Sequence, residues 1–217
     1  MSEAPLVRAG VLGDVHAEDV RVEAALAWLA SAGVDRVLSV GDIVDGQGSV
    51  DRACAALRRV DALAVRGNHE RWLASGALRD LPDATAARDL APETLAFLGA
   101  LPPTRRLATV AGPLLLCHGL GDDDMNRLLP DDTGYAIESN DALAELLRTD
   151  LALVVNGHTH RRMVRTFGGG RLTVINAGTL ARDHEPGFFV VDFSARTATW
   201  HDLAVADRPV AGATIAF

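Results

Sequence analysis

Side chains of the kinds that bind metal ions gather in short loops of this chain. Five apolar runs, each typical of a buried strand, end in a loop that carries Asp, Asn or His. These residues are Asp14 and His16, Asp42, Asn68 and His69, His118, and His158 with His160. Of the seven histidines, only His184 and His201 lie elsewhere. Imidazoles beside carboxylates favour metal chemistry, because they supply the nitrogen and oxygen ligands of transition metals.

The motif Gly157-His158-Thr159-His160 follows the apolar residues 151–155. Its glycine lets the backbone turn sharply where the strand ends. Two imidazoles one residue apart in a loop can reach different metal ions, whereas on a regular strand they would point to opposite faces. Alone, such a pair is more often a hydrogen-bonded surface or core feature, so the other loops decide its interpretation.

Alternating strands and helices must position these loops. We expect strands at residues 6–12, 36–40 and 62–65, a helix through Val22 and Leu29 that Gly33 ends, and a second helix at residues 50–59. This alternation predicts a parallel sheet with right-handed crossovers. Open α/β sheets bind ligands at the carboxyl ends of their strands, where the five loops lie.

The second half of the chain predicts hairpins. A polar connector at residues 79–91 and a short helix at 92–99 precede it, an acidic loop occupies residues 120–137, and Ser139, Asn140 or Asp141 can cap a helix that runs to about residue 148. Further strands are expected at residues 107–110, 114–117, 151–155, 162–167, 171–175, 188–193 and 197–203. The late strands predict antiparallel pairing on a second sheet. Residues 1–217 should form one α/β domain, a four-layer α-β-β-α sandwich of two mixed sheets flanked by helices.

Composition limits the partners and the compartment. A formal net charge of -8 and a pI of about 5.3 argue against non-specific binding to nucleic acid or to an anionic membrane. Cys54 and Cys117 are the only cysteines, so a reduced, cytoplasmic chain is the simpler interpretation. Residues 1–5 show no signal peptide, and no window is long and apolar enough to span a bilayer.

Five motifs follow one another between residues 14 and 160. They are Asp14-x-His16, Gly41-Asp42-x-x-Asp45, Gly67-Asn68-His69-Glu70, His118 and Gly157-His158-x-His160. In kind and order they resemble the calcineurin-like metallophosphoesterases. The resemblance implies one divalent metal on Asp14, His16, Asp42 and His160, and a second on Asp42, Asn68, His118 and His158. It implies Asp42 as the bridge between two ions of Mn, Fe, Zn or Co, for which mixed nitrogen and oxygen ligands are suited.

The resemblance also implies a reaction. Two such ions activate a bridging hydroxide that attacks phosphorus in line. His69 is the expected general acid, since it adjoins Asn68 yet is outside the ligand pattern. Asp45 is expected to orient His69, the alternative being that Asp45 caps the following turn. The protein serine/threonine phosphatases of this superfamily have Arg where this chain has Gly46, so the small prokaryotic phosphodiesterases and phosphatases are more similar.

Several residues near the motifs leave two interpretations open. Arg66 and Arg71 can contact a substrate phosphate, or they can form surface ion pairs. Residues 176–179 can support the rim of the site or form a simple turn, and residues 122–124 favour a solvated acidic loop over one that holds water or a substrate amine. His184 and His201 are interpreted as ordinary surface or strand residues. Substrate preference is expected from residues 71–91 and 120–137.

The sequence therefore predicts a hydrolase, a dinuclear metal-dependent phosphoesterase acting on a small phosphodiester or phosphomonoester. One alternative is a non-catalytic binding module that keeps the fold, as the retromer subunit of the superfamily does. Such a module is expected to lack catalytic histidines, and none is missing here. The other alternative is a nuclease, like the repair exonuclease of the superfamily, which the acidic pI disfavours. The oligomeric state is left open.

Overall fold

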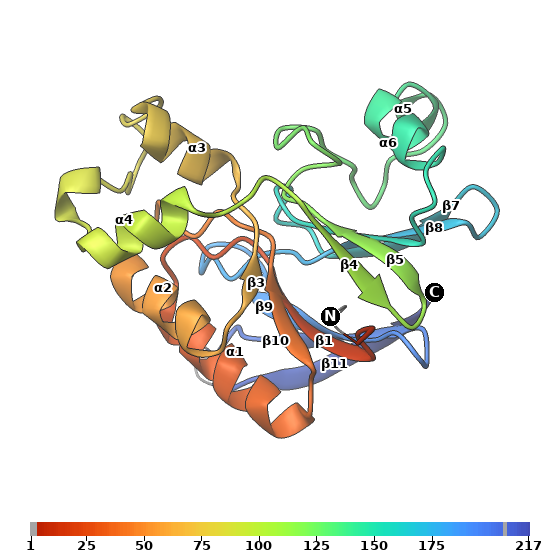
Figure 1. Cartoon of the computed structure of the whole chain (residues 1–217), viewed down its shortest axis with the longest axis horizontal. Helices are drawn as coiled ribbons and strands as arrows, with labels where there is room; N and C mark the ends of the chain where they lie inside the picture. Colours follow the sequence, from red (N-terminus) through yellow and green to blue (C-terminus); the bar gives the residue numbers. More distant parts are fainter. Residues whose placement is uncertain (1–3, 206–207) are drawn as a thin grey trace.

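Two β-sheets packed face to face form the body of the protein in a computed structural model, which describes residues 4–205 and 208–217 (Figure 1). The first sheet has the order β11-β10-β9-β1-β2-β3 and the second the order β4-β5-β6-β8-β7. The first contains β1 (Arg8–Leu12), β2 (Arg36–Ser39), β3 (Leu63–Ala64), β9 (Gly187–Asp192), β10 (Thr197–Asp202) and β11 (Val210–Ala216). The second contains β4 (Arg105–Thr109), β5 (Gly112–Leu116), β6 (Leu153–Asn156), β7 (Met163–Phe167) and β8 (Leu172–Asn176). Both sheets mix parallel and antiparallel pairs.

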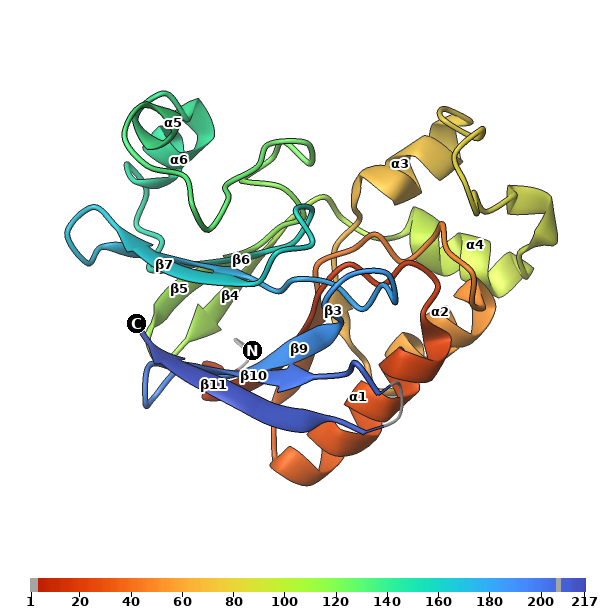
Figure 2. The same cartoon turned by 180° about the vertical axis from the view of Figure 1, so that it is seen from behind.

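Helices cover the outer faces of the two sheets (Figure 2). Beside the first sheet lie α1 (Asp19–Ala32), α2 (Val50–Arg59) and α4 (Pro92–Gly99), and beside the second lie α5 (Tyr135–Glu138) and α6 (Asp141–Leu146). As predicted, Gly33 ends α1 with a left-handed backbone, φ 67°. The predicted four-layer α-β-β-α sandwich is therefore confirmed.

The period-two alternation of the strands divides the apolar side chains between layers. On β9, Phe188 packs toward α1 while the next residue, Phe189, packs between the two sheets. On β6, Val154 packs toward α6 while Leu153 faces the space between the sheets. The central strands of each sheet are thus buried on both faces, which fixes the strand ends from which the motif loops emerge.

The prediction that the late strands belong to the second sheet was wrong for β9 and β10. β9 pairs antiparallel with β1, from Arg8 opposite Asp192 to Leu12 opposite Phe188, and β10 follows β9. β1 has β2 on one side only, so its other edge was free to accept β9. Local sequence pattern signals that a strand exists, whereas pairing across the chain is decided by the packing of the whole.

Four elements were not predicted. α3 (Asn68–Ser75) begins at the third motif, which was interpreted as a loop. β11 has every residue exposed, so no buried face produced an alternating pattern. α5 and a 3₁₀ turn at Ala87–Asp89 interrupt segments expected to be irregular. The hairpin of β4 and β5 turns at residues 110–111 rather than 111–113.

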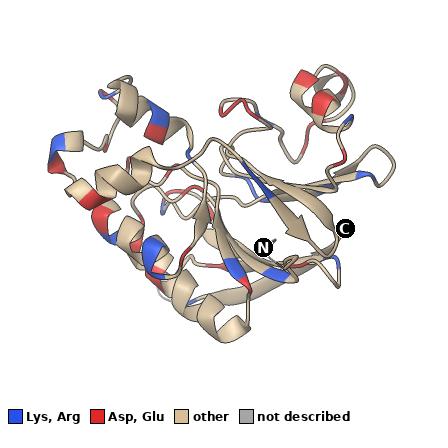
Figure 3. Ribbon diagram, in the orientation of Figure 1, with Lys and Arg blue, Asp and Glu red and all other residues tan. Residues whose placement is uncertain are grey.

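Other local predictions can be compared with the structure. Of the three candidate caps of α6, Asn140 is the one whose side chain accepts a hydrogen bond from the Leu143 amide, at 3.0 Å. Within residues 4–205 and 208–217, no helix is both long and apolar enough to cross a membrane. The signal-peptide prediction concerns residues 1–5, of which 1–3 lie outside the described residues. Figure 3 shows basic residues scattered over several elements and interspersed with acidic ones.

Candidate metal centre

The loops after β1, β2, β3, β5 and β6 meet at one end of the sandwich. Asp14, Asp42, Asn68 and His118 are all at most 2% exposed, and His158 and His160 are partly exposed beside them. Because β1, β2 and β3 run parallel in one sheet and β5 and β6 run parallel in the other, their carboxyl ends bring these residues together from distant parts of the sequence.

The first group of side chains contains Asp14, His16 and His160. The Nε2 atoms of His16 and His160 lie 3.0 Å apart, and Nε2 of His160 lies 3.3 Å from Oδ2 of Asp14. This Oδ2 is buried, and among the described residues it has no hydrogen-bond partner. A buried carboxylate oxygen without a partner is costly, so the group fits a bound cation.

The second group contains Asp42, His118 and His158, with Asn68 between them. Nε2 of His118 lies 2.9 Å from Oδ1 of Asn68 and 3.2 Å from Oδ2 of Asp42. Nδ1 of His158 lies 3.0 Å from the same Asn68 oxygen. Two ring nitrogens and two oxygens that converge on one point are a donor set for a transition-metal ion.

Asp42 lies between the two groups. Its carboxylate lies within 4.8 Å of ring nitrogens of His118 and His158 on one side, and of His16 and His69 on the other. His158 and His160 belong to different groups, so the two rings of one motif face separate positions. A carboxylate shared in this way can bridge two cations.

Backbone strain is concentrated in these loops. Positive φ angles occur at His16 (43°), Asp42 (46°), Asp45 (64°), His158 (68°) and His160 (56°). Asp and His tolerate the left-handed region better than most residues, yet each such position costs free energy. Such strain is held at five of the nine predicted site residues.

Glu70 holds two of the strained loops in place. Its buried carboxylate accepts hydrogen bonds from the backbone amides of Asp42 (2.9 Å), Ile43 (2.6 Å), Val44 (3.1 Å) and Gly67 (2.7 Å). One side chain therefore joins the loop after β2 to the start of α3, and so fixes Asp42 relative to Asn68.

Backbone carbonyls set the orientation of two imidazoles. Nδ1 of His118 donates to the carbonyl of Val40 at 2.8 Å, and Nδ1 of His16 donates to the carbonyl of Asp45 at 2.9 Å. Each bond leaves Nε2 of the ring directed toward the centre, where a cation could take the place of a proton.

His69 lies on a separate side of the centre. Its Nδ1 donates to Oδ2 of Asp45 at 2.7 Å, and its Nε2 lies 3.9 Å from Oδ2 of Asp42. Asp45 also accepts bonds from both terminal nitrogens of Arg79, each 2.9 Å, and from the amide of Thr85 at 2.7 Å. Burial raises the pKa of Asp45, but His69 and Arg79 outweigh it and hold that pKa at about 2. Burial lowers the pKa of His69, and the hydrogen bond to Asp45 and the charge of Asp42 raise it above its ordinary value.

Burial and neighbouring charges shift the pKa values of several side chains in the centre. Burial raises the pKa of Asp14 to about 7. Burial disfavours charge on His118 as well, but Asp42 outweighs it and raises the pKa of His118 to about 10. Burial and the neighbouring His16 lower the pKa of His160 to about 3. A cation would replace the proton on His118 and restore the charge on Asp14.

The contacts of Arg71, Asp124 and Asn176 bear on the interpretations that the sequence left open. Arg71 forms a two-pronged ion pair with Asp124, at 2.6 and 2.7 Å, as the ion-pair interpretation expected. Asp124 is therefore not simply solvated, and the pair joins α3 to the loop after β5. Asn176 donates to the carbonyl of Gly157 at 2.6 Å, which supports the histidine loop. Arg66 is exposed.

Gly46 occupies a position where no side chain fits. A Cβ atom there would lie 2.0 Å from the carbonyl oxygen of His16. The backbone of this chain is thus incompatible with the Arg that the protein serine/threonine phosphatases carry at this point.

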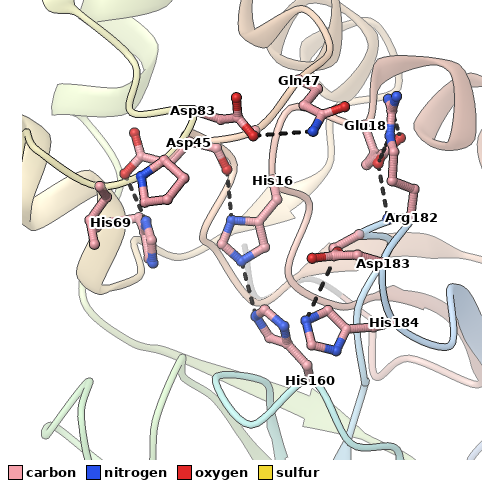
Figure 4. Close-up of a pocket in the computed structure, with 14 residues that line it drawn as sticks. His16, Glu18, Asp45, Gln47, His69, Asp83, His160, Arg182, Asp183 and His184 are labelled. Carbon is pink, nitrogen blue, oxygen red and sulfur yellow. Dashed lines mark hydrogen bonds and ion pairs between the residues drawn. The ribbon is translucent and has the colours of Figure 1, made fainter.

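Some residues of the site could not be found from sequence motifs. Arg79 and Thr85 come from the connector, and Arg182 and His184 from the loop after β8. The His184 ring packs edge-on against His160, with 4.6 Å between ring centroids, although it was interpreted as an ordinary residue. His201 is a buried strand residue between Trp28 and Phe188. A cavity of about 320 Å³ opens beside the centre, lined in part by His16, His69, His160 and His184 (Figure 4).

Comparisons with known proteins agree with this geometry. A family model of the calcineurin-like phosphoesterase superfamily domain matches residues 7–196. The chain is similar to the crystal structure of a metallophosphoesterase from Sphaerobacter thermophilus, with 23% identity, TM-score 0.66, and coverage of 91% of this chain and 88% of that one. It is similar to a hypothetical protein from Pyrococcus horikoshii OT3, with 16% identity, TM-score 0.72 and coverage of 90% and 87%. It is also similar to Vps29 from Entamoeba histolytica, crystallised with zinc, with 19% identity, TM-score 0.57 and coverage of 96% and 98%. At these identities the likeness shows the fold, and no protein of curated function matches the sequence.

Proposed function

The chain belongs to the calcineurin-like phosphoesterase superfamily, and from that membership we propose that it is a dinuclear metal-dependent phosphoesterase. Its substrate would be a small phosphodiester or phosphomonoester. The observation that carries the proposal is the position of Asp42, whose carboxylate lies among ring nitrogens of His16 and His69 on one side and of His118 and His158 on the other. A structural scaffold has no need of this arrangement, because burying several carboxylates and imidazoles close together, with Oδ2 of Asp14 left without a hydrogen bond, costs stability.

The proposed ligands divide as the sequence predicts. Asp14, His16, Asp42 and His160 would hold one divalent ion, and Asp42, Asn68, His118 and His158 the other. Manganese, iron, zinc or cobalt suits these nitrogen and oxygen donors, and manganese is the ion we would test first. When bound, the two ions supply Lewis acidity that activates water and neutralises charge on the phosphoryl oxygens.

His69 would donate a proton to the leaving group, and Asp45 would stabilise the charged His69 ring. Nε2 of His69 faces the centre, while Nδ1 is occupied by Asp45. An imidazolium held in this way can donate from Nε2 to the leaving oxygen near neutral pH. Asp45 stabilises the charged ring, and Arg79 fixes Asp45, so the three residues act as one unit.

Assays with and without metal test the proposal. The purified chain, treated with a chelator and reloaded with Mn²⁺, should hydrolyse 4-nitrophenyl phosphate, bis(4-nitrophenyl) phosphate, or both. Asn68→Ala and His69→Ala should reduce turnover while far-UV circular dichroism stays unchanged. Inactivity on both esters, with no bound metal in elemental analysis of the purified protein, would refute the proposal.

A non-catalytic binding module is the second candidate, because Vps29 proteins share the fold. Binding of metal without turnover on any phosphate ester would favour this candidate. Against it stands His69, whose Nδ1 bonds to Asp45 while its Nε2 faces the centre, which are the contacts of a proton donor.

We also propose a cytoplasmic protein whose partner is a small phosphate ester. Cys54 and Cys117 are buried and free, as expected of a reducing compartment. The basic residues form no stripe in Figure 3 and the net charge is -8, which disfavours a membrane surface or nucleic acid as the partner. DNA binding that weakens steeply with salt would contradict this.

A further inference from the structure

A cavity of about 320 Å³ lies beside the centre (Figure 4). The rings of His16, His69 and His160 form one side of it. Glu18, Asp45 and the segments 46–47, 81–83 and 181–184 form the rest. Pockets for small ligands span roughly 300–1,000 Å³, so this one admits a small organic group and excludes a folded partner.

The cavity lies on the side of the leaving group, if the proposed function holds. A general acid must come within hydrogen-bond distance of the leaving oxygen. His69 lines this cavity, so the alcohol attached to that oxygen enters it when the phosphoryl group lies on the two ligand groups. The walls of the cavity therefore select the alcohol.

One wall is fixed by a buried carboxylate. Glu18 is 3% exposed and accepts bonds from the Arg182 amide (3.0 Å), from Nε of Arg182 (2.7 Å) and from Nη2 of Arg182 (3.1 Å). Glu18 also accepts a bond from Arg21 at 2.7 Å. Arg182 is thus held by its backbone amide and by one edge of its guanidinium, while its side chain stays 47% exposed at the cavity. The wall is preformed, which lowers the entropic cost of binding.

One side-chain contact and one backbone contact hold the opposite wall together. Nε2 of Gln47 donates to Oδ2 of Asp83 at 3.2 Å, and the amide of Gly46 donates to the carbonyl of Asp83 at 3.0 Å. These bonds link the loop after β2 to the connector. Both walls are therefore set before any substrate arrives.

The charges of the walls nearly cancel. Glu18 lies between two arginines, so that cluster has one excess positive charge, and Asp45 is balanced by Arg79. Asp83 and Asp183 are exposed, and among the described residues neither forms an ion pair with an arginine. Asp83 and Asp183 together carry two negative charges, whereas the Glu18 cluster carries one excess positive charge. The walls therefore do not attract an anionic leaving group.

Both hydrogen-bond donors and hydrogen-bond acceptors line this nearly neutral cavity. Arg182, Gln47 and His184 carry N–H donors, whereas Asp83 and Asp183 are acceptors. Leu81, Pro82 and Ala181 add an apolar surface. A hydroxyl group both donates and accepts, and the C–H face of a polyol packs on apolar carbon. The geometry points to a subsite for a small uncharged leaving alcohol that carries further hydroxyl groups, such as a glycerol or sugar unit, with Asp83, Asp183 and Arg182 setting the preference.

Three leaving groups of similar size on one phosphoryl group test this subsite. Propyl phosphate, glycerol 1-phosphate and 2-phosphoglycerate are assayed with Mn²⁺, each as its monoester and as its methyl diester. The kcat/KM for the glycerol ester should exceed that for the propyl ester about tenfold, the effect of one or two net hydrogen bonds. The kcat/KM for 2-phosphoglycerate should be the lowest of the three.

Substitution of the rim carboxylates should change this order. In the double variant Asp83→Asn with Asp183→Asn, the ratio of glycerol to propyl kcat/KM should fall several-fold, and the relative rate on 2-phosphoglycerate should rise. Both residues are exposed, so the fold should tolerate the changes. The matched control is Asp150→Asn, an exposed carboxylate that pairs with Arg106 far from the cavity, and it should leave all three ratios unchanged.

The outcomes separate this inference from the proposed function. No turnover of any ester, including 4-nitrophenyl phosphate, overturns both. Turnover with equal kcat/KM for the propyl and glycerol esters, or with 2-phosphoglycerate fastest, overturns the subsite and leaves the phosphoesterase intact. Equal effects of the double variant and of Asp150→Asn also overturn the subsite.

Discussion

Nδ1 of His69 donates to the carboxylate of Asp45 at 2.7 Å, and this contact sets the direction in which the ring can act. With Nδ1 occupied, the ring presents Nε2 to the centre, 3.9 Å from Oδ2 of Asp42. Asp45 is itself held by Arg79 and Thr85, which come from a segment about 40 residues further along the chain. Proton donation by His69 therefore depends on residues outside the loop that carries it.

Asp45→Asn should shift the pH dependence of catalysis toward acid. The negative charge of Asp45 helps to raise the pKa of His69, so its loss lowers that pKa and the ring loses its proton at a lower pH. We expect the alkaline limb of kcat/KM to move to lower pH and kcat to fall on the order of 100-fold. Asp150→Asn should behave as the wild type. An unmoved alkaline limb in Asp45→Asn would show that His69 is not the acid.

Arg79→Ala should move the same limb in the opposite direction. Loss of a positive charge near His69 raises the pKa of its imidazolium, so the alkaline limb should move to higher pH. Two charged hydrogen bonds to Asp45 are lost as well, which should cost about 2 kcal/mol of unfolding free energy in urea titrations. Arg79→Lys should recover part of both effects. Shifts of the same sign in Arg79→Ala and Asp45→Asn would contradict this coupling.

The sequence predicted the residues of the centre better than their supports. Each predicted ligand, such as Asp14 or His118, directly follows an apolar strand, so the strand pattern locates it, although its role as a ligand stays a prediction. The bond between Glu18 and Arg182 joins residues 164 positions apart, and that between Asp45 and Arg79 joins residues 34 apart. Neither pair belongs to a local motif, because only the packed fold brings the partners together. The motifs that indicate the family are local in the sequence, so they could be found there. The pairing of β9 with β1 depends on the packed fold, and its sheet was therefore predicted wrongly.

Glu70→Gln should loosen the two loops that carry Asp42 and Asn68. The carboxylate accepts four backbone amides, and the amide side chain of Gln keeps only one oxygen, so about half of these bonds are lost. Each buried amide left without a partner costs roughly 1–3 kcal/mol. We expect a lower melting temperature and weaker Mn²⁺ binding by calorimetry, with Glu145→Gln on α6 as a surface control. Unchanged Mn²⁺ affinity in a destabilised variant would limit Glu70 to a structural role.

Metal binding should release protons below neutral pH. Burial raises the pKa of Asp14 to about 7, so at pH 6 this carboxyl is mostly protonated and must lose its proton to serve as a ligand. The apparent affinity for Mn²⁺ should therefore rise between about pH 5.5 and pH 7.5, with the ionised form favoured above the pKa. Calorimetry at pH 6 in buffers of different ionisation enthalpy measures the protons released. In Asp14→Asn this release should decrease, and an undiminished release would assign it to other groups.

The two thiols should react only when the protein opens. Burial raises the pKa of both Cys54 and Cys117 to about 12, so at pH 8.5 the thiolate fraction is about one in 3,000, against roughly half for a free thiol. We expect no prompt reaction of the native chain with a thiol reagent, and two equivalents in guanidinium chloride. Mn²⁺ should slow the native reaction further, because a ligand that binds the folded state stabilises it. Calcium, which these nitrogen-rich groups suit poorly, is the control ion. Prompt titration of one thiol without denaturant, or equal protection by both ions, would contradict the prediction.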